Sequence, residues 1–498
     1  MYYYSTRNHA EYTTASKAIK KGLAPDGGLY VPAEKATPFK ADNLPTGHYR
    51  EIANTILKLF LTDFSSAQVE SAVNLAYSAE NFDHPDVTPL HKLTTDLFIL
   101  ELWHGPTSSF KDVALQILPL LLRTAVQITG EKSEIVILTA TSGDTGKSAL
   151  EGFRDIDNTK IVIYFPEKGV SEVQKLQMIT QEGNNVDVAA VRGNFDDTQT
   201  GVKEIFNDHV LAEKLAEAGY RLSSANSINW GRLLPQIVYY FSAYRDLASR
   251  KELLPGEKIN FVVPTGNFGN ILAGYYARRL GLPINRLICS ANRNNVLSDF
   301  INSGHYNSRR PLHITLSPSM DILISSNLER LLFELTGHDT MRVNSWMQEL
   351  KESGEYIIDG ETLKNLQELF WADYADDEET VQLIQDTYRN HNYLIDTHTA
   401  VGKSVLSKYR NRVEDNSLAV LLSTASPYKF TGSVARALFG NGRFKNRSEL
   451  ELLKILSSKT GIPIPVNLAD LNQKPIRHKQ VIAPAAMRDH LLSFLNLQ

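Results

Sequence analysis

The sequence is poor in cysteine, and this limits its chemistry. Cys289 is the only cysteine among 498 residues. An intramolecular disulfide is therefore impossible, and a structural metal site built from several cysteines cannot form. We accordingly expect no metal centre and favour a reducing compartment, the cytoplasm, over an oxidising one.

Long apolar runs and an excess of positive charge are also missing. No uninterrupted hydrophobic stretch approaches the roughly 18 residues of a membrane span, and the polar start MYYYSTRNHA lacks the layout of a signal peptide. The formal net charge of -4 and a pI near 6.4 provide no basic field for nucleic acid or for an anionic membrane surface. We therefore predict a cytoplasmic protein whose partners are small molecules.

The length and the order of segments predict several lobes. A chain of 498 residues exceeds the roughly 250–300 at which one core stops growing. Residues 1–92 are mostly helical in pattern and form a predicted N-terminal domain. Residues 93–443 form a predicted catalytic core of two lobes, and residues 444–498 a loop-rich tail that ends in a helix over 486–497.

The central region alternates buried strands with amphipathic helices, which is typical of parallel sheets joined by crossover connections. We therefore predict an α/β fold. The expected strands are rich in Val and Ile and cover Ile135 to Leu138, Ile161 to Phe165, Val186 to Val191, Phe261 to Val263, Leu287 to Ser290 and Ala419 to Leu422.

Two of these strands run into glycine-containing loops that precede helices. The first loop is Thr141-Ser142-Gly143-Asp144-Thr145-Gly146 and the second is Thr265-Gly266-Asn267-Phe268-Gly269-Asn270. Backbone N–H groups and the helix dipole favour an anion at such a turn. A single loop of this kind is common in any parallel sheet, but two of them indicate two phosphate groups.

A nucleotide-binding P-loop is the competing interpretation of the first loop, because Gly146-Lys147-Ser148 resembles the end of that motif. The spacing excludes it. The first glycine of the motif would fall at position 141, where the chain has Thr141.

Lys111 is the candidate for covalent chemistry. Ser109 and Asp112 resemble a capping box, which places Lys111 in the first turn of a helix. Positive charge at a helix start and desolvation by Phe110 and Val113 both lower a lysine pKa. A neutral amine can form a Schiff base with an aldehyde and later move protons. A lysine that merely points into solvent is the plain alternative.

Ordered blocks along the chain resemble the fold type II pyridoxal-phosphate enzymes, and among them the threonine synthases. The blocks are Pro25 to Pro32, His104 to Asp112, Thr141 to Gly146, Asn226 to Arg232, Pro264 to Asn270, Ser317 to Asp321 and Thr397 to Gly402. This resemblance implies two lobes that each contain a parallel sheet, a mainly helical N-terminal domain, and pyridoxal 5'-phosphate as cofactor.

The resemblance also implies roles for particular residues. Lys111 would bind the cofactor covalently, Gly266, Asn267, Phe268, Gly269 and Asn270 would surround its phosphate, and the Thr424 hydroxyl would face its pyridine nitrogen. Substrate would be bound by Ser142, Gly143, Asp144, Thr145, Asn229 and Arg232. The implied reaction converts O-phosphohomoserine and water to threonine and phosphate by elimination at Cγ and addition of water at Cβ.

Three points stay open at this level. A serine or threonine dehydratase of the same fold, or a non-catalytic relative that binds phosphorylated metabolites, would share most of these blocks. His104 and His398 could contact the substrate, but histidines beside a packed turn are more often structural. The family includes both monomers and homodimers, and the sequence does not decide between them.

Overall fold

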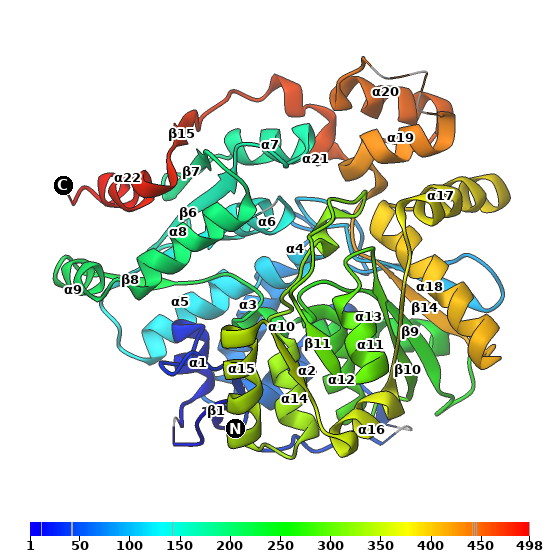
Figure 1. Ribbon diagram of the computed structural model, residues 1–498, viewed down its shortest axis with the longest axis horizontal. Helices are drawn as coiled ribbons and strands as arrows, with labels where there is room; N and C mark the ends of the chain where they lie inside the picture. The colour runs from blue at the N-terminus through cyan, green and yellow to red at the C-terminus, as the bar shows by residue number, and fades with distance from the viewer. Residues whose placement is uncertain are drawn as a thin grey trace.

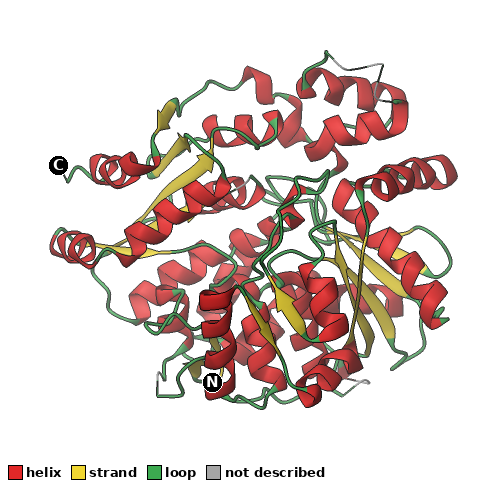
Figure 2. Cartoon of the chain, viewed as in Figure 1, coloured by secondary structure: helices red, strands yellow, loops and turns green. Residues whose placement is uncertain are grey.

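The computed structural model describes residues 1–10, 12–40, 43–141, 143–440, 442, 444 and 446–497. It is a mixed α/β structure with two larger sheets and two short antiparallel pairs of strands, as Figures 1 and 2 show. The predicted α/β architecture, with two lobes that each contain a parallel sheet, is confirmed.

The N-terminal part is mainly helical, as expected. Strands β1 (Tyr3–Ser5) and β2 (Tyr30–Pro32) pair antiparallel, and the helices are α1 (Ala15–Lys21), α2 (Tyr49–Phe60) and α3 (Ser66–Ala76). Buried side chains of α2, such as Ile52 and Ile56, join the main hydrophobic core. These helices therefore pack onto the rest of the chain through one continuous apolar core.

A six-stranded sheet forms the lobe at the lower right of Figure 1. Its strand order is β13, β10, β9, β14, β4, β3, and only the β3–β4 pair is antiparallel. The strands are β3 (Leu90–Lys92), β4 (Leu97–Glu101), β9 (Ile259–Pro264), β10 (Ile284–Ala291), β13 (Phe370–Tyr374) and β14 (Ala419–Ser423). Residues 90–92, the last residues of the predicted N-terminal domain, form β3 and are thus one edge strand of this sheet.

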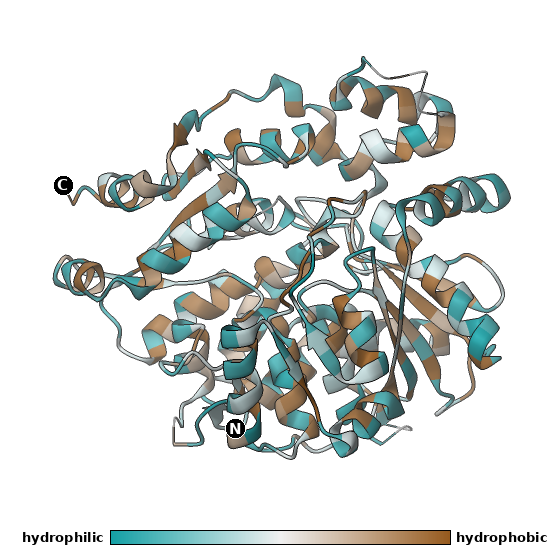
Figure 3. Cartoon of the chain, in the orientation of Figure 1, coloured by the Kyte–Doolittle hydropathy of each residue, from teal (hydrophilic) through white to brown (hydrophobic). Residues whose placement is uncertain are grey.

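Alternating residues of the six-stranded sheet face two different helical layers. Phe261 and Val263 pack into the core shared with α11 (Gln236–Ser249) and α12 (Gly269–Arg279). Val262, between them, packs with Val405 and Leu406 of α18 (Thr397–Val413). This burial of both faces explains why the strands are continuous hydrophobic runs, and Figure 3 shows the same brown strands beneath helices with teal outer turns.

A five-stranded, wholly parallel sheet forms the second lobe, with the order β15, β7, β6, β5, β8. On one face it packs against α8, α9 and α22, and on the other against α5 and α6. These elements are β5 (Glu134–Ala140), β6 (Thr159–Pro166), β7 (Val186–Val191), β8 (Tyr220–Ser223), β15 (Gln480–Ile482), α5 (Leu118–Ile128), α6 (Asp144–Phe153), α8 (Phe195–Asn207), α9 (His209–Glu217) and α22 (Met487–Phe494).

The C-terminal tail contains more regular structure than its glycines and prolines predict. It holds α20 (Glu449–Thr460), α21 (Val466–Ala469), β15 and α22, and β15 adds an edge strand next to β7. The predicted terminal helix is confirmed but is shorter at both ends. The sequence did not predict β15, because its three residues are exposed or half-exposed and show no alternation of polar and apolar side chains.

The remaining elements connect the two sheets or cover them. They are α4 (Lys111–Leu115), α7 (Glu172–Ile179), α10 (Trp230–Leu233), α13 (Val296–Ser303), β11 (His305–Asn307), α14 (Leu328–Leu335), α15 (Thr340–Ser353), β12 (Glu355–Ile357), α16 (Gly360–Leu369), α17 (Asp377–His391) and α19 (Thr431–Phe439). β11 and β12 form the second antiparallel pair.

Candidate active site

Lys111 is the first residue of α4, in the segment that follows the carboxyl end of β4. Its side chain is only 10% exposed, and its Nζ lies 4.7 Å from the centre of the Phe110 ring. The predicted position in the first helical turn is confirmed, but α4 spans five residues. Burial is therefore a larger influence on this amine than the dipole of so short a helix.

The predicted capping box between Ser109 and Asp112 is wrong. The Asp112 carboxylate accepts hydrogen bonds from the backbone N and the Oγ1 of Thr107, at 2.8 and 2.6 Å, and Phe110 is the N-cap residue. A Cβ on Gly105 would lie 2.4 Å from the Cβ of Asp112. The glycine thus lets the loop fold back over α4, and Asp112 fixes that loop.

Two segments distant in sequence hold the loop before Lys111. Ser108 has a left-handed backbone, with φ of 57°, and its carbonyl accepts a hydrogen bond from Ser426 N at 3.1 Å. Its Oγ donates to Asn467 Oδ1 of α21 at 2.9 Å. The C-terminal tail therefore contacts the loop that positions the lysine.

Two basic residues flank the same buried carboxylate. Asp144 Oδ2 lies 3.6 Å from Lys111 Nζ, and Asp144 Oδ1 lies 2.7 Å from Lys429 Nζ. Burial opposes ionisation of Asp144, but Lys429 and Lys111 outweigh it and hold the pKa of the carboxyl well below its usual range. Asp144 is therefore an anion in the folded protein.

The Lys111 amine is easier to deprotonate than an ordinary lysine. Burial lowers its pKa, Asp144 opposes that shift, and the charges of Arg232 and Lys429 add to it, so that the pKa is about 8. The amine is therefore neutral more often near neutral pH than an ordinary lysine, which suits both a covalent bond to an aldehyde and proton transfer.

The first glycine loop begins α6 and touches Arg232. Gly143, with φ of 147°, is the N-cap residue, and Asp144 and Thr145 are the first two helical residues. Gln174 donates from Nε2 to Asp144 Oδ1 at 2.8 Å. Arg232 donates from Nη2 to Thr145 Oγ1 at 3.4 Å. The predicted residue Ser142 lies outside the described residues.

Arg232 and Asn229 occupy the same short segment but differ in what they offer a ligand. Arg232 is buried and donates from Nη1 to Ala225 O at 2.8 Å, and desolvation lowers its pKa to about 10. The amide of Asn229 is bonded to Ile19 O, Ser224 O and Gly231 N. Asn229 thus caps α10, while Arg232 faces the Thr145 loop.

The second glycine loop wraps the start of α12. Phe268 adopts a left-handed backbone with φ of 63° just before Gly269, and a Cβ on Gly266 would lie 2.9 Å from Ser319 O. Asn270 Oδ1 accepts from Tyr239 OH at 2.6 Å. The Asn270 Nδ2 atom is buried without a hydrogen-bond partner among the described residues, so this cradle carries an unused donor.

Thr424 follows the carboxyl end of β14, as predicted, and is 6% exposed. Its carbonyl accepts a hydrogen bond from Phe110 N at 2.9 Å, so the chain beside Lys111 and the chain at Thr424 are joined directly. The side chain of the neighbouring Ser423 accepts a hydrogen bond from Trp103 Nε1 at 3.1 Å.

The two histidines have structural partners. His104 is bonded to Asp83 at 2.6 Å and to Glu101 at 2.8 Å; burial would lower its pKa, but these hydrogen bonds raise it to about 9. His398 Nδ1 contacts Asp396 at 2.8 Å, and its Nε2 accepts from Ser319 N at 3.2 Å. His398 therefore supports the Ser319 loop beside Gly266.

Sequence analysis missed Lys429 and Gln174. Lys429 is fully buried and also donates to Thr107 O at 3.0 Å. Its position could have indicated a role in the site. Lys429 lies five residues beyond Thr424, after the carboxyl end of β14, and ligands bind at the carboxyl ends of strands in parallel sheets. Gln174 lies in an amphipathic helix and carries no comparable signal.

Family models match almost the whole chain. Residues 2–77 match the model described as threonine synthase N terminus, residues 82–424 the model of pyridoxal-phosphate dependent enzymes, and residues 399–490 the model described as threonine synthase, C-terminal. The chain belongs to the threonine synthase family. Pyridoxal phosphate is the cofactor of this family, so the implied cofactor and the sequence resemblance are confirmed.

Relatives within the threonine synthase family are similar over most of their length. The threonine synthase of Pseudomonas aeruginosa is 40% identical over 88% of this chain and 91% of its own, and that of Saccharomyces cerevisiae 37% identical over 92% and 93%. The human protein named Threonine synthase-like 1 is 40% identical over 90% of this chain, but the chain spans only 61% of that relative's length.

A solved structure of a pyridoxal-phosphate-bound threonine synthase from Brucella melitensis superposes with a TM-score of 0.87, at 39% identity and 99% coverage of both chains. The threonine synthase family fold and the residues of the site agree with the cofactor: Lys111 supplies a buried amine, and the 266–270 loop supplies a glycine cradle with the unpartnered Asn270 Nδ2. No group of His, Cys, Asp or Glu suited to a metal was found within the described part of the chain.

Proposed function

We propose that this chain is a threonine synthase that converts O-phospho-L-homoserine and water to L-threonine and phosphate, as a carbon–oxygen lyase acting on a phosphate ester. The observation that carries the proposal is the charge of the site. Lys111 and Lys429 flank the buried carboxylate of Asp144, and the buried Arg232 contacts the adjacent Thr145, so three basic side chains stand near one carboxylate. Such an excess of positive charge suits a substrate that brings a phosphate of its own.

In this proposal one anion-binding region holds the cofactor phosphate and the other holds the substrate phosphate. Gly266, Asn267, Phe268, Gly269 and Asn270 hold the cofactor phosphate, and Thr424 faces the ring nitrogen. Arg232 and the 142–145 loop bind the substrate phosphate, with Thr145 already within 3.4 Å of the guanidinium. Asn229 acts on the substrate indirectly: it caps α10, the helix that contains Arg232.

When bound, pyridoxal phosphate supplies an electron sink for negative charge at the substrate Cα. Lys111 takes the proton from Cα and returns it later, because its pKa near 8 leaves part of the amine neutral. Asp144 orients this amine, and Lys429 holds the Asp144 carboxylate in place. Arg232 keeps the phosphate in place until it leaves from Cγ.

Two alternatives give different products. A serine or threonine dehydratase of the same fold acts on an uncharged side chain and gains nothing from Arg232. A non-catalytic protein that binds phosphorylated metabolites is the alternative suggested by the name of the human relative, Threonine synthase-like 1. It would bind O-phosphohomoserine without releasing phosphate.

The test measures phosphate and threonine released from O-phospho-L-homoserine, and keto acid released from L-serine and L-threonine. The proposal expects equal amounts of phosphate and threonine, a loss of at least about a thousandfold in Lys111→Ala, and a rise mainly in KM in Arg232→Gln. Lys364→Ala, at an exposed lysine of α16, is the control. Keto acid without phosphate release would establish a dehydratase, and binding without turnover a non-catalytic protein.

Some expectations about the whole protein stay proposals. We propose that residues 1–92, 93–443 and 444–498 are its three units, that it acts in the cytoplasm as a monomer or homodimer, and that it binds neither nucleic acid nor membranes. Within the described residues, no helix has the length and hydrophobicity needed to cross a membrane. Size-exclusion chromatography with light scattering will give the oligomeric state.

A further inference from the structure

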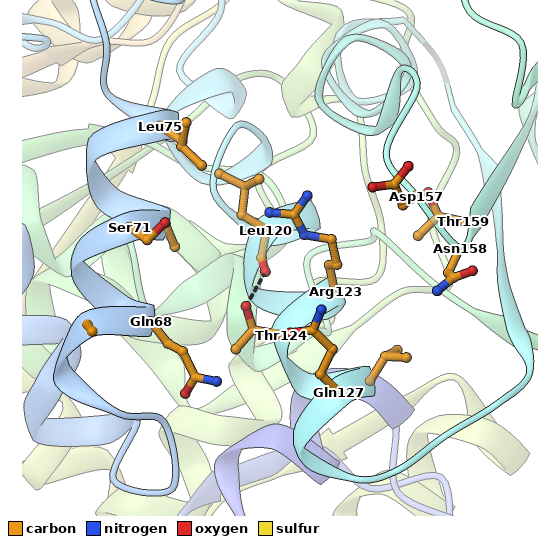
Figure 4. A pocket seen from close by; sticks show the side chains of 13 residues that line it. Gln68, Ser71, Leu75, Leu120, Arg123, Thr124, Gln127, Asp157, Asn158 and Thr159 are labelled. Carbon is orange, nitrogen blue, oxygen red and sulfur yellow. Dashed lines mark hydrogen bonds between the residues drawn. The ribbon is translucent and has the colours of Figure 1, made fainter.

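A cavity that Lys111 does not line lies between α3, α5 and the loop that precedes β6. Its volume is about 460 Å³, which falls within the range of small-molecule sites. Figure 4 shows Gln68 and Ser71 of α3 on one side, Arg123, Thr124 and Gln127 of α5 in the middle, and Asp157 and Asn158 of the loop opposite. The cavity thus joins the N-terminal helices to the lobe with the five-stranded sheet.

The cavity contains one cation and one anion that do not pair with each other. Arg123 is half-buried and Asp157 exposed, and neither side chain has a hydrogen bond or ion pair with any described residue. An unpaired guanidinium within a cavity is a site for a carboxylate. The carboxylate on the opposite wall suits an ammonium group.

The rest of the wall is apolar on one side and carries amides on another. Leu75 is 52% exposed and Leu120 forms the neighbouring wall, so an apolar group of a ligand can be covered there. Gln127 adds an exposed amide without a partner among the described residues. No aromatic ring lines the described cavity, and its only basic side chain is Arg123, so a nucleotide with several phosphates fits poorly.

We propose that this cavity binds a small α-amino acid with an apolar side chain. The ligand carboxylate pairs with Arg123, the ammonium group faces Asp157, and the side chain lies against Leu75 and Leu120. The site is independent of the active site, because the residues around Lys111 do not line it.

The experiment must keep amino acids from reacting at Lys111. The holoenzyme is therefore first reduced with borohydride, which makes the bond between Lys111 and the cofactor permanent, and binding is then measured by isothermal titration calorimetry. The probes are L-leucine and L-valine, compared with isovalerate, which lacks the ammonium group, and isobutylamine, which lacks the carboxylate.

The proposal expects L-leucine or L-valine to bind at least about tenfold more tightly than either single-charge compound. Arg123→Gln and Asp157→Asn should each weaken this binding at least about tenfold, while unreduced samples of both variants keep the parent activity. Arg154→Gln is the control, because Arg154 does not line the cavity and pairs with Glu151 at 3.0 Å.

Two results would overturn the proposal. One is no heat of binding for any amino acid at millimolar concentration. The other is binding that both cavity variants retain, which would place the ligand elsewhere. Because the reduced protein is inactive by design, neither result depends on whether the proposed catalytic reaction is correct.

Discussion

Replacing Lys429 by methionine tests how charge is arranged around Lys111. Lys429 is 0% accessible to solvent, and its Nζ lies 2.7 Å from Asp144 Oδ1. Methionine keeps most of the buried stem but leaves Asp144 with one cation fewer. Removing one member of a buried ion pair costs about 3–5 kcal/mol, and we expect a loss of unfolding free energy of this size in urea denaturation.

The same substitution has a second, more specific effect. The charge of Lys429 lowers the pKa of Lys111, whereas Asp144 raises it. Without Lys429 the influence of Asp144 grows, and the pKa of Lys111 rises from about 8 toward the ordinary lysine value. The amine is then protonated over a wider pH range and reacts more slowly with the aldehyde of the cofactor.

The assay follows the rate at which the cofactor-free protein recovers its visible absorption after addition of pyridoxal phosphate, between pH 6.5 and 10. The parent protein should reach half its maximal rate near pH 8, and Lys429→Met should do so at higher pH. Lys364→Met, at an exposed lysine, serves as the control. An unchanged midpoint in a folded Lys429→Met protein would refute the coupling between these lysines.

Three further changes test other contacts. Gly266→Ala should weaken pyridoxal phosphate binding about tenfold or more in a fluorescence titration, because the new Cβ would lie 2.9 Å from Ser319 O and move the cradle. His104→Gln should remove a pH dependence: with a pKa of about 9, the protonated ring stabilises the parent fully below about pH 6.5, and this stability, on the order of 3 kcal/mol, is lost as the pH rises through 9. Denaturation curves at pH 6.5 and 9.5 should therefore differ less in the variant. Asn467→Ala removes the acceptor of the Ser108 hydroxyl, 2.9 Å away. The variant should lose only about 1 kcal/mol of stability but should have a lower kcat/KM. An unchanged kcat/KM would show that α21 does not position the loop.

Sequence reasoning succeeded where the signal was local and repeated. The expected strand over 186–191 is β7, and the other five expected strands lie within β5, β6, β9, β10 and β14. Runs of β-branched residues buried on both faces have few other conformations open to them. The position of Lys111 at a helix start was predicted correctly, although the capping box used to predict it does not form.

The contacts of the site were less predictable, because they join segments far apart in sequence. Asp112 was expected to cap its own helix but binds Thr107, and the loop reversal that permits this depends on Gly105. Lys429 reaches Asp144 across 285 positions, 429 minus 144. A periodic pattern says nothing about such pairs, which only the packing of the two lobes brings together.

The edge strand β15 has a consequence for how the chain is made. Until residues 480–482 are in place, the hydrogen-bonding groups along the outer side of β7 have no strand beside them. An open, hydrophobic strand edge invites pairing with a second copy. A chain that ended shortly before Gln480 would therefore contain most of the active-site residues, but the edge of β7 would be unpaired and prone to aggregation. Strand β15 is synthesised only after residues 192–479, so this edge of β7 has no neighbouring strand until then.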